Sequence, residues 1–238
     1  MGRVETLDPN YFLKDRTRFI RFYYEAGTAG FADVKRRIEF KLSPYDNPPY
    51  SEDSEPPYLV EWIDAEAAMD VLGLSCVSLL SDSLKLYFNT LRDRVLRFSF
   101  DKSEDAILKR NGFPAAYRAA LGPILDTDWS DCPADFDVIE QVVLARNKGQ
   151  HGEDITSFRS TFDRKMLARH PLPIFANSEE LSLLTAEDGS LESLLMPSIK
   201  VSREALFGAL EEVDILVDWI EGRREQAEEW VRKQRSSR

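Results

Sequence analysis

The chain has 238 residues, of which 43% are hydrophobic and 31% charged, and its net charge at pH 7 is −11. This length and balance are typical of a globular protein with its own core, and two cysteines are too few for a secreted disulfide scaffold. The chain has no run of 18 apolar residues and no signal-peptide core at its start, so we expect a cytoplasmic protein without a membrane span. The acidic charge argues against broad, nonspecific nucleic-acid binding, but a local basic site is compatible with it.

The first 42 residues show helical periodicity with an interruption. Aromatic and aliphatic residues at helical spacing predict one helix over about 11–25 and a second over 31–40. Gly27 and Gly30 are expected to separate the two. We interpret residues 1–42 as an N-terminal helical arm or helical hairpin.

A proline-rich, acidic stretch follows, and then the strongest helical pattern of the chain. Five prolines exclude a helix interior over 43–58, so we expect a linker or long loop there. From 59 to 100, apolar residues recur at steps near three and four. This pattern predicts one long helix, or two helices joined near Gly73.

Shorter helical stretches continue the pattern. One is expected over 104–121, interrupted at 112–114 by a Gly-Phe-Pro sequence. Asp131 is expected to cap the next helix, and Gly149 and Gly152 are expected to end it.

The C-terminal part ends in a helix with an apolar seam. Residues 181–196 are ambiguous between a short helix and a pair of strands. Ser202 is expected to cap a last helix, whose apolar residues over 206–220 alternate steps of four and three, and which continues to about Trp230. The elements together predict an all-α fold, with residues 59–238 as an antiparallel helical bundle.

Few side chains in this sequence are suited to chemistry. His151 and His170 are its only histidines. We find no Cys/His metal spacing, phosphate-binding loop, dinucleotide motif or hydrolase signature, and therefore expect neither a metal nor another cofactor. What remains is a short polar string at the end of a predicted helix, Arg146-Asn147-Lys148-Gly149-Gln150-His151.

This string resembles the R-x4-6-H motif of HEPN domains, in which a polar residue follows the arginine. HEPN proteins are all-helical bundles, and many are metal-independent RNases that act as toxins or antiviral effectors. In that family a two-fold dimer brings two Arg–His pairs into one cleft. The resemblance implies an endoribonuclease with Arg146, His151 and Asn147 as its catalytic residues. It also implies a homodimer, and an antitoxin or other regulatory protein as a further partner.

The chemistry of this pair suits RNA cleavage. An imidazole can move a proton from the 2′-hydroxyl to the leaving 5′-oxygen, and a guanidinium can hold the phosphate oxygens. His151 fits the first task and Arg146 the second, while Asn147 can orient the imidazole or bind the phosphate; the product carries a 2′,3′-cyclic phosphate. Residues five apart lie about 140° apart on an ideal helix, so the helix must end near Gly149 for the pair to converge.

The surroundings of the motif are locally basic. Residues 144–170 include six basic and three acidic residues. We assign weak RNA binding to four of the basic residues, Lys148, Arg159, Arg164 and Lys165. A second Arg–His match, Arg164 with His170, is set aside because the following prolines place His170 in a loop.

Two other interpretations stay open. Arg146 can form a purely structural salt bridge to Glu140 or Glu153, with His151 as a helix-capping imidazole. The same bundle can also be a HEPN-like domain that has lost catalysis and serves as an interaction or regulatory module.

Overall fold

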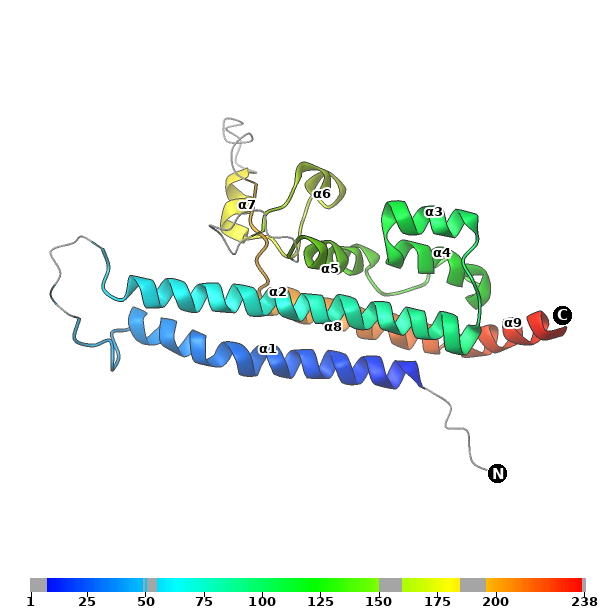
Figure 1. Cartoon of the computed structure of the whole chain (residues 1–238), viewed down its shortest axis with the longest axis horizontal. Helices are drawn as coiled ribbons and strands as arrows, with labels where there is room; N and C mark the ends of the chain where they lie inside the picture. Colours follow the sequence, from blue (N-terminus) through cyan, green and yellow to red (C-terminus); the bar gives the residue numbers. More distant parts are fainter. Residues whose placement is uncertain (1–7, 49, 51–54, 150–159, 185–195, 237–238) are drawn as a thin grey trace, which may run out of the picture. The chain divides into compact units, whose positions relative to one another are not determined.

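The computed structural model describes residues 8–48, 50, 55–149, 160–184 and 196–236. Within these ranges the chain consists of helices and connecting segments, and its β structure is limited to two isolated bridges (Figure 1). The prediction of an all-α fold is confirmed. No helix in the described ranges combines the length and the apolar character that a membrane crossing requires.

The backbone contacts divide the chain into two compact units, each built from separate stretches of sequence. Unit 1 comprises 1–18, 80–142 and 208–238, and unit 2 comprises 19–79 and 143–207. The boundaries fall inside four of the helices, so each of these helices contributes residues to both units. The division into an arm, a linker and a bundle stays a prediction.

Helix α1 (Pro9–Glu39) is continuous, so the predicted separation at Gly27 and Gly30 is wrong. A β-carbon at Gly27 would lie 2.5 Å from Cδ2 of Leu72 in α2 (Leu59–Thr90), whereas Gly30 has open space around it. Glycine inside a helix costs about 1 kcal/mol relative to alanine. The close approach of α2 at Gly27 gives a packing reason for accepting that cost.

The loop between these two helices contains no helix in its described residues, as its prolines predict. Its ends are held by the rings of Tyr45 and Tyr58, which meet edge to face at 4.9 Å. The Tyr58 hydroxyl also donates a hydrogen bond to the Asn47 carbonyl at 3.2 Å. The loop therefore closes on itself before α2 begins.

Helix α2 runs unbroken through Gly73, so of the two predicted possibilities the single helix is the one that forms. At Gly73 an added β-carbon would lie 2.8 Å from the Val201 Cβ, so the glycine makes room for a crossing segment. At its C-terminal end α2 passes directly into a six-residue π-helix, η1 (Leu91–Leu96). Arg97 ends this π-helix in the left-handed conformation, with a φ of 56°.

Two short helices follow, α3 (Lys102–Asn111) and α4 (Phe113–Leu125), and they pack side by side. Asp101 caps α3 by accepting hydrogen bonds from the Ser103 and Glu104 amides, and the Glu104 carboxylate accepts a hydrogen bond from the Asp101 amide. Gly112, at a φ of 86°, separates the helices. The interruption predicted over 112–114 is confirmed at Gly112, whereas Phe113 and Pro114 belong to the first turn of α4.

Helix α5 (Phe136–Gly149) begins later than the predicted cap at Asp131, and that prediction is wrong. Asp131 instead forms an ion pair with Arg223. Where the helix begins, the carboxylate of Asp135 accepts a hydrogen bond from the Asp137 amide at 2.8 Å. A carboxylate four residues further along thus takes the position that the sequence assigned to Asp131.

The remaining helices are α6 (Arg164–Arg169), α7 (Ser178–Leu184), α8 (Arg203–Glu221) and α9 (Arg224–Ser236). The predicted cap at Ser202 is confirmed, because its Oγ accepts a hydrogen bond from the Ala205 amide at 3.1 Å. The predicted last helix is divided into α8 and α9 by a turn at 222–223. Of the ambiguous stretch 181–196, the first residues belong to α7, and 185–195 lie outside the described residues.

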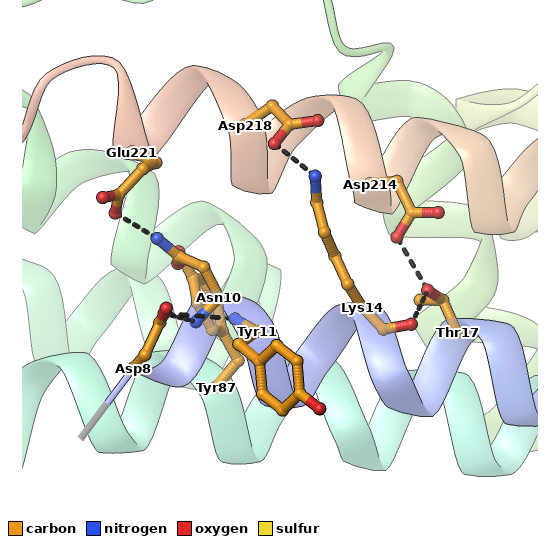
Figure 2. Close-up of polar contacts among 9 residues, drawn as sticks. All are labelled: Asp8, Asn10, Tyr11, Lys14, Thr17, Tyr87, Asp214, Asp218 and Glu221. Atoms are coloured by element: carbon orange, nitrogen blue, oxygen red, sulfur yellow. Dashed lines mark hydrogen bonds and ion pairs between the residues drawn. The ribbon is translucent and has the colours of Figure 1, made fainter. Parts of the chain in front are cut away.

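Unit 1 has a polar seam between the first turns of α1 and helix α8 (Figure 2). Lys14 forms an ion pair with Asp218, and the Thr17 hydroxyl donates to the Asp214 carboxylate at 2.7 Å. Asn10 lies at the end of this seam, where its side chain forms hydrogen bonds with residues of both α2 and α8. The three helices are therefore fixed in register by polar contacts as well as by apolar packing.

Unit 2 has a charged cluster centred on Glu66, whose side chain is only 12% exposed. Its carboxylate accepts hydrogen bonds from both Lys35 and Lys200. The Lys35 ammonium also lies 4.2 Å from the ring centroid of Trp62, whose indole donates to Glu39 at 2.9 Å. The cluster connects α1, α2 and the segment before α8.

Candidate functional site

The C-terminal end of α5 carries the arginine and asparagine of the predicted catalytic string. Arg146 is half-buried and Asn147 is exposed. The Nη1 of Arg146 donates a hydrogen bond to Oδ1 of Asn147 at 3.2 Å, so the amide helps to orient the guanidinium. A β-carbon at Gly149 would lie 3.1 Å from Cδ2 of Leu74, which shows how closely the last turn of α5 approaches α2.

Lys148 joins the end of α5 to the start of α6. Its carbonyl accepts a hydrogen bond from the Ser160 hydroxyl at 3.2 Å, and its Nζ lies 3.3 Å from Oδ2 of Asp163. Asp163 also caps α6 by accepting a hydrogen bond from the Met166 amide at 2.9 Å. The amide of Met166 and the nearby Lys148 lower the pKa of Asp163, so this carboxylate stays ionised and holds the two helix ends together.

The cations of α6 follow directly after this junction. Arg164 and Lys165 occupy its first turn, and both are exposed. The Lys148–Asp163 ion pair therefore places two exposed cations next to the end of α5, which carries Arg146. The structural role of Lys148 was missed by sequence reasoning, because its partner lies 15 residues away in the chain.

Two predicted site residues, His151 and Arg159, lie outside the described residues. The Arg–His convergence expected at the end of α5 therefore stays a prediction. Within the described ranges, no group of three or more His, Cys, Asp or Glu side chains is arranged as a metal site.

The second Arg–His match lies at the two ends of α6. His170 follows the helix directly and is 3% exposed, and its amide donates to the Met166 carbonyl at 2.8 Å. Arg164 is exposed at the opposite end. A helix of six residues is about 9 Å long, so its length separates the two residues.

Comparison with protein-family models, with curated proteins and with solved structures finds no match for this chain. The resemblance to HEPN domains therefore depends on the Arg146–His151 string and on the all-α fold.

Proposed function

We propose that this chain is an endoribonuclease of the HEPN type that cleaves RNA at the C-terminal end of α5. One observation carries the proposal. The Lys148–Asp163 ion pair brings the exposed Arg164 and Lys165 next to the helix end at which Asn147 orients Arg146. Exposed cations at the helix junction that follows an oriented guanidinium suit an RNA phosphate, even on a chain of net charge −11.

The proposed reaction is an internal transesterification. The 2′-oxygen attacks the phosphorus, the bond to the 5′-oxygen breaks, and no water is consumed. His151 takes the proton of the 2′-hydroxyl and returns a proton to the leaving 5′-oxygen. Arg146 stabilises the charge that develops on the phosphate oxygens. The products are a 2′,3′-cyclic phosphate and a 5′-hydroxyl, and this route uses side chains alone.

The proposal includes partners and a location. A homodimer would bring two Arg–His pairs to one substrate by two-fold symmetry. The acidic charge of the chain suits a basic regulatory protein, such as an antitoxin, because opposite charges steer association. Catalysis would take place in the cytoplasm, where the RNA is.

A second function, a non-catalytic interaction module, is favoured by the exposed aromatic residues of α1. Phe12, Phe19 and Phe22 are 53%, 51% and 64% exposed, and the rings of Phe19 and Tyr23 stack at 6.0 Å. Large aromatic side chains on a surface are typical of protein-binding sites. A module of this kind would bind another chain through α1 and would not cleave RNA.

The distinguishing experiment incubates the purified full chain with RNA in EDTA and follows the products. We expect cleavage that leaves 2′,3′-cyclic phosphate ends, and a loss of about 100-fold or more in His151→Ala and Arg146→Ala. Arg146→Lys is also expected to lose activity, since lysine lacks the bidentate guanidinium.

Arg110→Ala provides a matched control. Arg110 precedes Asn111 at the end of α3, so it is also the arginine of an Arg-Asn pair at a helix end, and it is exposed. It should retain wild-type cleavage. If His151→Ala retains cleavage, His151 is not the proton carrier. If the folded wild-type chain cleaves no RNA, the interaction module is the better assignment.

A further inference from the structure

Unit 1 contains a hollow that the proposed RNA site does not use. Its volume is about 260 Å³, and it lies among the start of α1, η1, α4, α8 and α9. Most of its wall is apolar and comes from buried side chains, Leu91, Leu96, Leu121, Leu125, Ile220 and Ala227. An apolar wall of this kind favours a hydrocarbon over water.

One side of the hollow has a polar rim that is held in place by hydrogen bonds. Asn10 donates to the Glu221 carboxylate and accepts from the Tyr87 hydroxyl at 2.8 Å, as Figure 2 shows. Asp8 caps α1 by accepting hydrogen bonds from the Asn10 and Tyr11 amides, both at 3.1 Å. The rim is therefore preorganised, which lowers the entropic cost of ligand binding.

The charge of this rim is negative. The carboxylates of Asp8 and Glu221 line the hollow together with one cation, Arg224. Arg224 donates to Glu221 at 3.0 Å and also to Glu228 at 3.3 Å, so its charge is shared between two acids. The pKa of Tyr87 is raised, first by burial and then by nearby carboxylates that include Glu221 and Asp8, which is consistent with a negative field at this end of unit 1.

The π-helix η1 forms part of the apolar wall. Leu91, Val95 and Leu96 of η1 line the hollow, and π-helical turns are frequent at functional sites. Val95 and Leu96 also line a neighbouring hollow of about 410 Å³, which extends to Trp230 in α9. Val95 lines both hollows and is 40% exposed.

We propose that the 260 Å³ hollow binds a small amphiphile with a hydrocarbon body and a protonated amine head. The body would contact the leucines of η1 and α4, and the ammonium would lie at the rim formed by Asp8 and Glu221. A dry apolar cavity of 150 Å³ accepts benzene, so this hollow has room for roughly ten carbon atoms. The negative rim selects the amine over a carboxylate with the same chain.

The test measures binding of n-octylamine, 1-octanol and octanoate to the full chain by calorimetry at pH 7. We expect saturable 1:1 binding of octylamine, weaker binding of octanol, and at least tenfold weaker binding of octanoate. Glu221→Gln should reduce the difference in affinity between octylamine and octanol. Equal affinity for octylamine and octanoate would overturn the assigned amine head.

A filling substitution tests the location. Ala227→Leu places a larger side chain in the wall and should weaken octylamine binding at least tenfold, while Ala119→Leu, at an exposed position of α4, should leave it unchanged. If Ala227→Leu fails to fold, Val95→Phe narrows the hollow from a partly exposed position instead. The proposed site would be refuted if a folded variant with a filled hollow still binds octylamine as the wild type does. It would also be refuted if the wild type shows no saturable binding.

Discussion

Replacing Glu66 by glutamine should destabilise unit 2 by an amount that depends on pH. The Glu66 side chain is 12% exposed, and it accepts hydrogen bonds from Lys35 and Lys200, which are 20% and 40% exposed. Breaking a fully buried ion pair costs 3–5 kcal/mol, because a charge is left without a partner. Partial exposure of both lysines reduces this cost, so we expect a loss of about 2–3 kcal/mol in the free energy of unfolding at pH 7.

The sign of the pH dependence follows from the pKa of Glu66. Burial by itself would raise that pKa, but the hydrogen bonds and charges of Lys200 and Lys35 bring it below the usual 4.5. A carboxyl whose pKa is lower in the folded state contributes stability above its unfolded pKa. This contribution is lost as the pH falls through the folded pKa. The difference between wild type and Glu66→Gln should therefore be constant from pH 6 to pH 8 and should shrink as the pH falls below 4.5 toward the lower pKa of the folded state.

The measurement is urea unfolding followed by circular dichroism at several pH values. Glu61→Gln, on an exposed position of the same helix, serves as the control and should change stability by less than about 0.5 kcal/mol. A Glu66→Gln variant as stable as this control at pH 7 would refute the reasoning. A stability difference that does not shrink as the pH falls below 4.5 would refute the assignment of its cause to the Glu66 charge.

Three further outcomes are expected. Gly73→Ala should lower the free energy of unfolding by about 1–2 kcal/mol in urea titrations, because the new β-carbon would lie 2.8 Å from the Val201 Cβ. A gain in stability would show that the higher helix propensity of alanine outweighs this clash. Tyr87→Phe should cost about 1 kcal/mol in the same assay through the lost 2.8 Å hydrogen bond to Asn10, and an unchanged midpoint would show that this bond contributes nothing. Burial raises the pKa of the Cys76 thiol to about 11, so a disulfide reagent at pH 8 should modify Cys76 only after urea unfolds the chain. The assay uses Cys132→Ser, because Cys132 is a second free thiol and is partly exposed, and rapid labelling of this native variant would contradict the burial of Cys76.

Local sequence determined most helices of this chain. The spacing of apolar residues predicted α2, α4 and α8, the prolines predicted the loop before α2, and Ser202 marked the start of α8. These signals act over a few residues, because hydrogen bonds and side-chain spacing within one helix depend only on neighbouring positions. The Arg146-Asn147 pair at the end of α5 was visible for the same reason.

Tertiary structure decided what depends on residues distant in sequence. Gly27 lies inside α1 at a position where Leu72 leaves no room for a β-carbon. Asp131 does not cap α5, because it forms an ion pair with Arg223. The Lys148–Asp163 junction and the apolar hollow of unit 1 are likewise assembled from several elements. A glycine can lie inside a helix or end it, and a carboxylate can cap a helix or form an ion pair, at similar local free energy. Packing against side chains distant in sequence decides which of these structures forms.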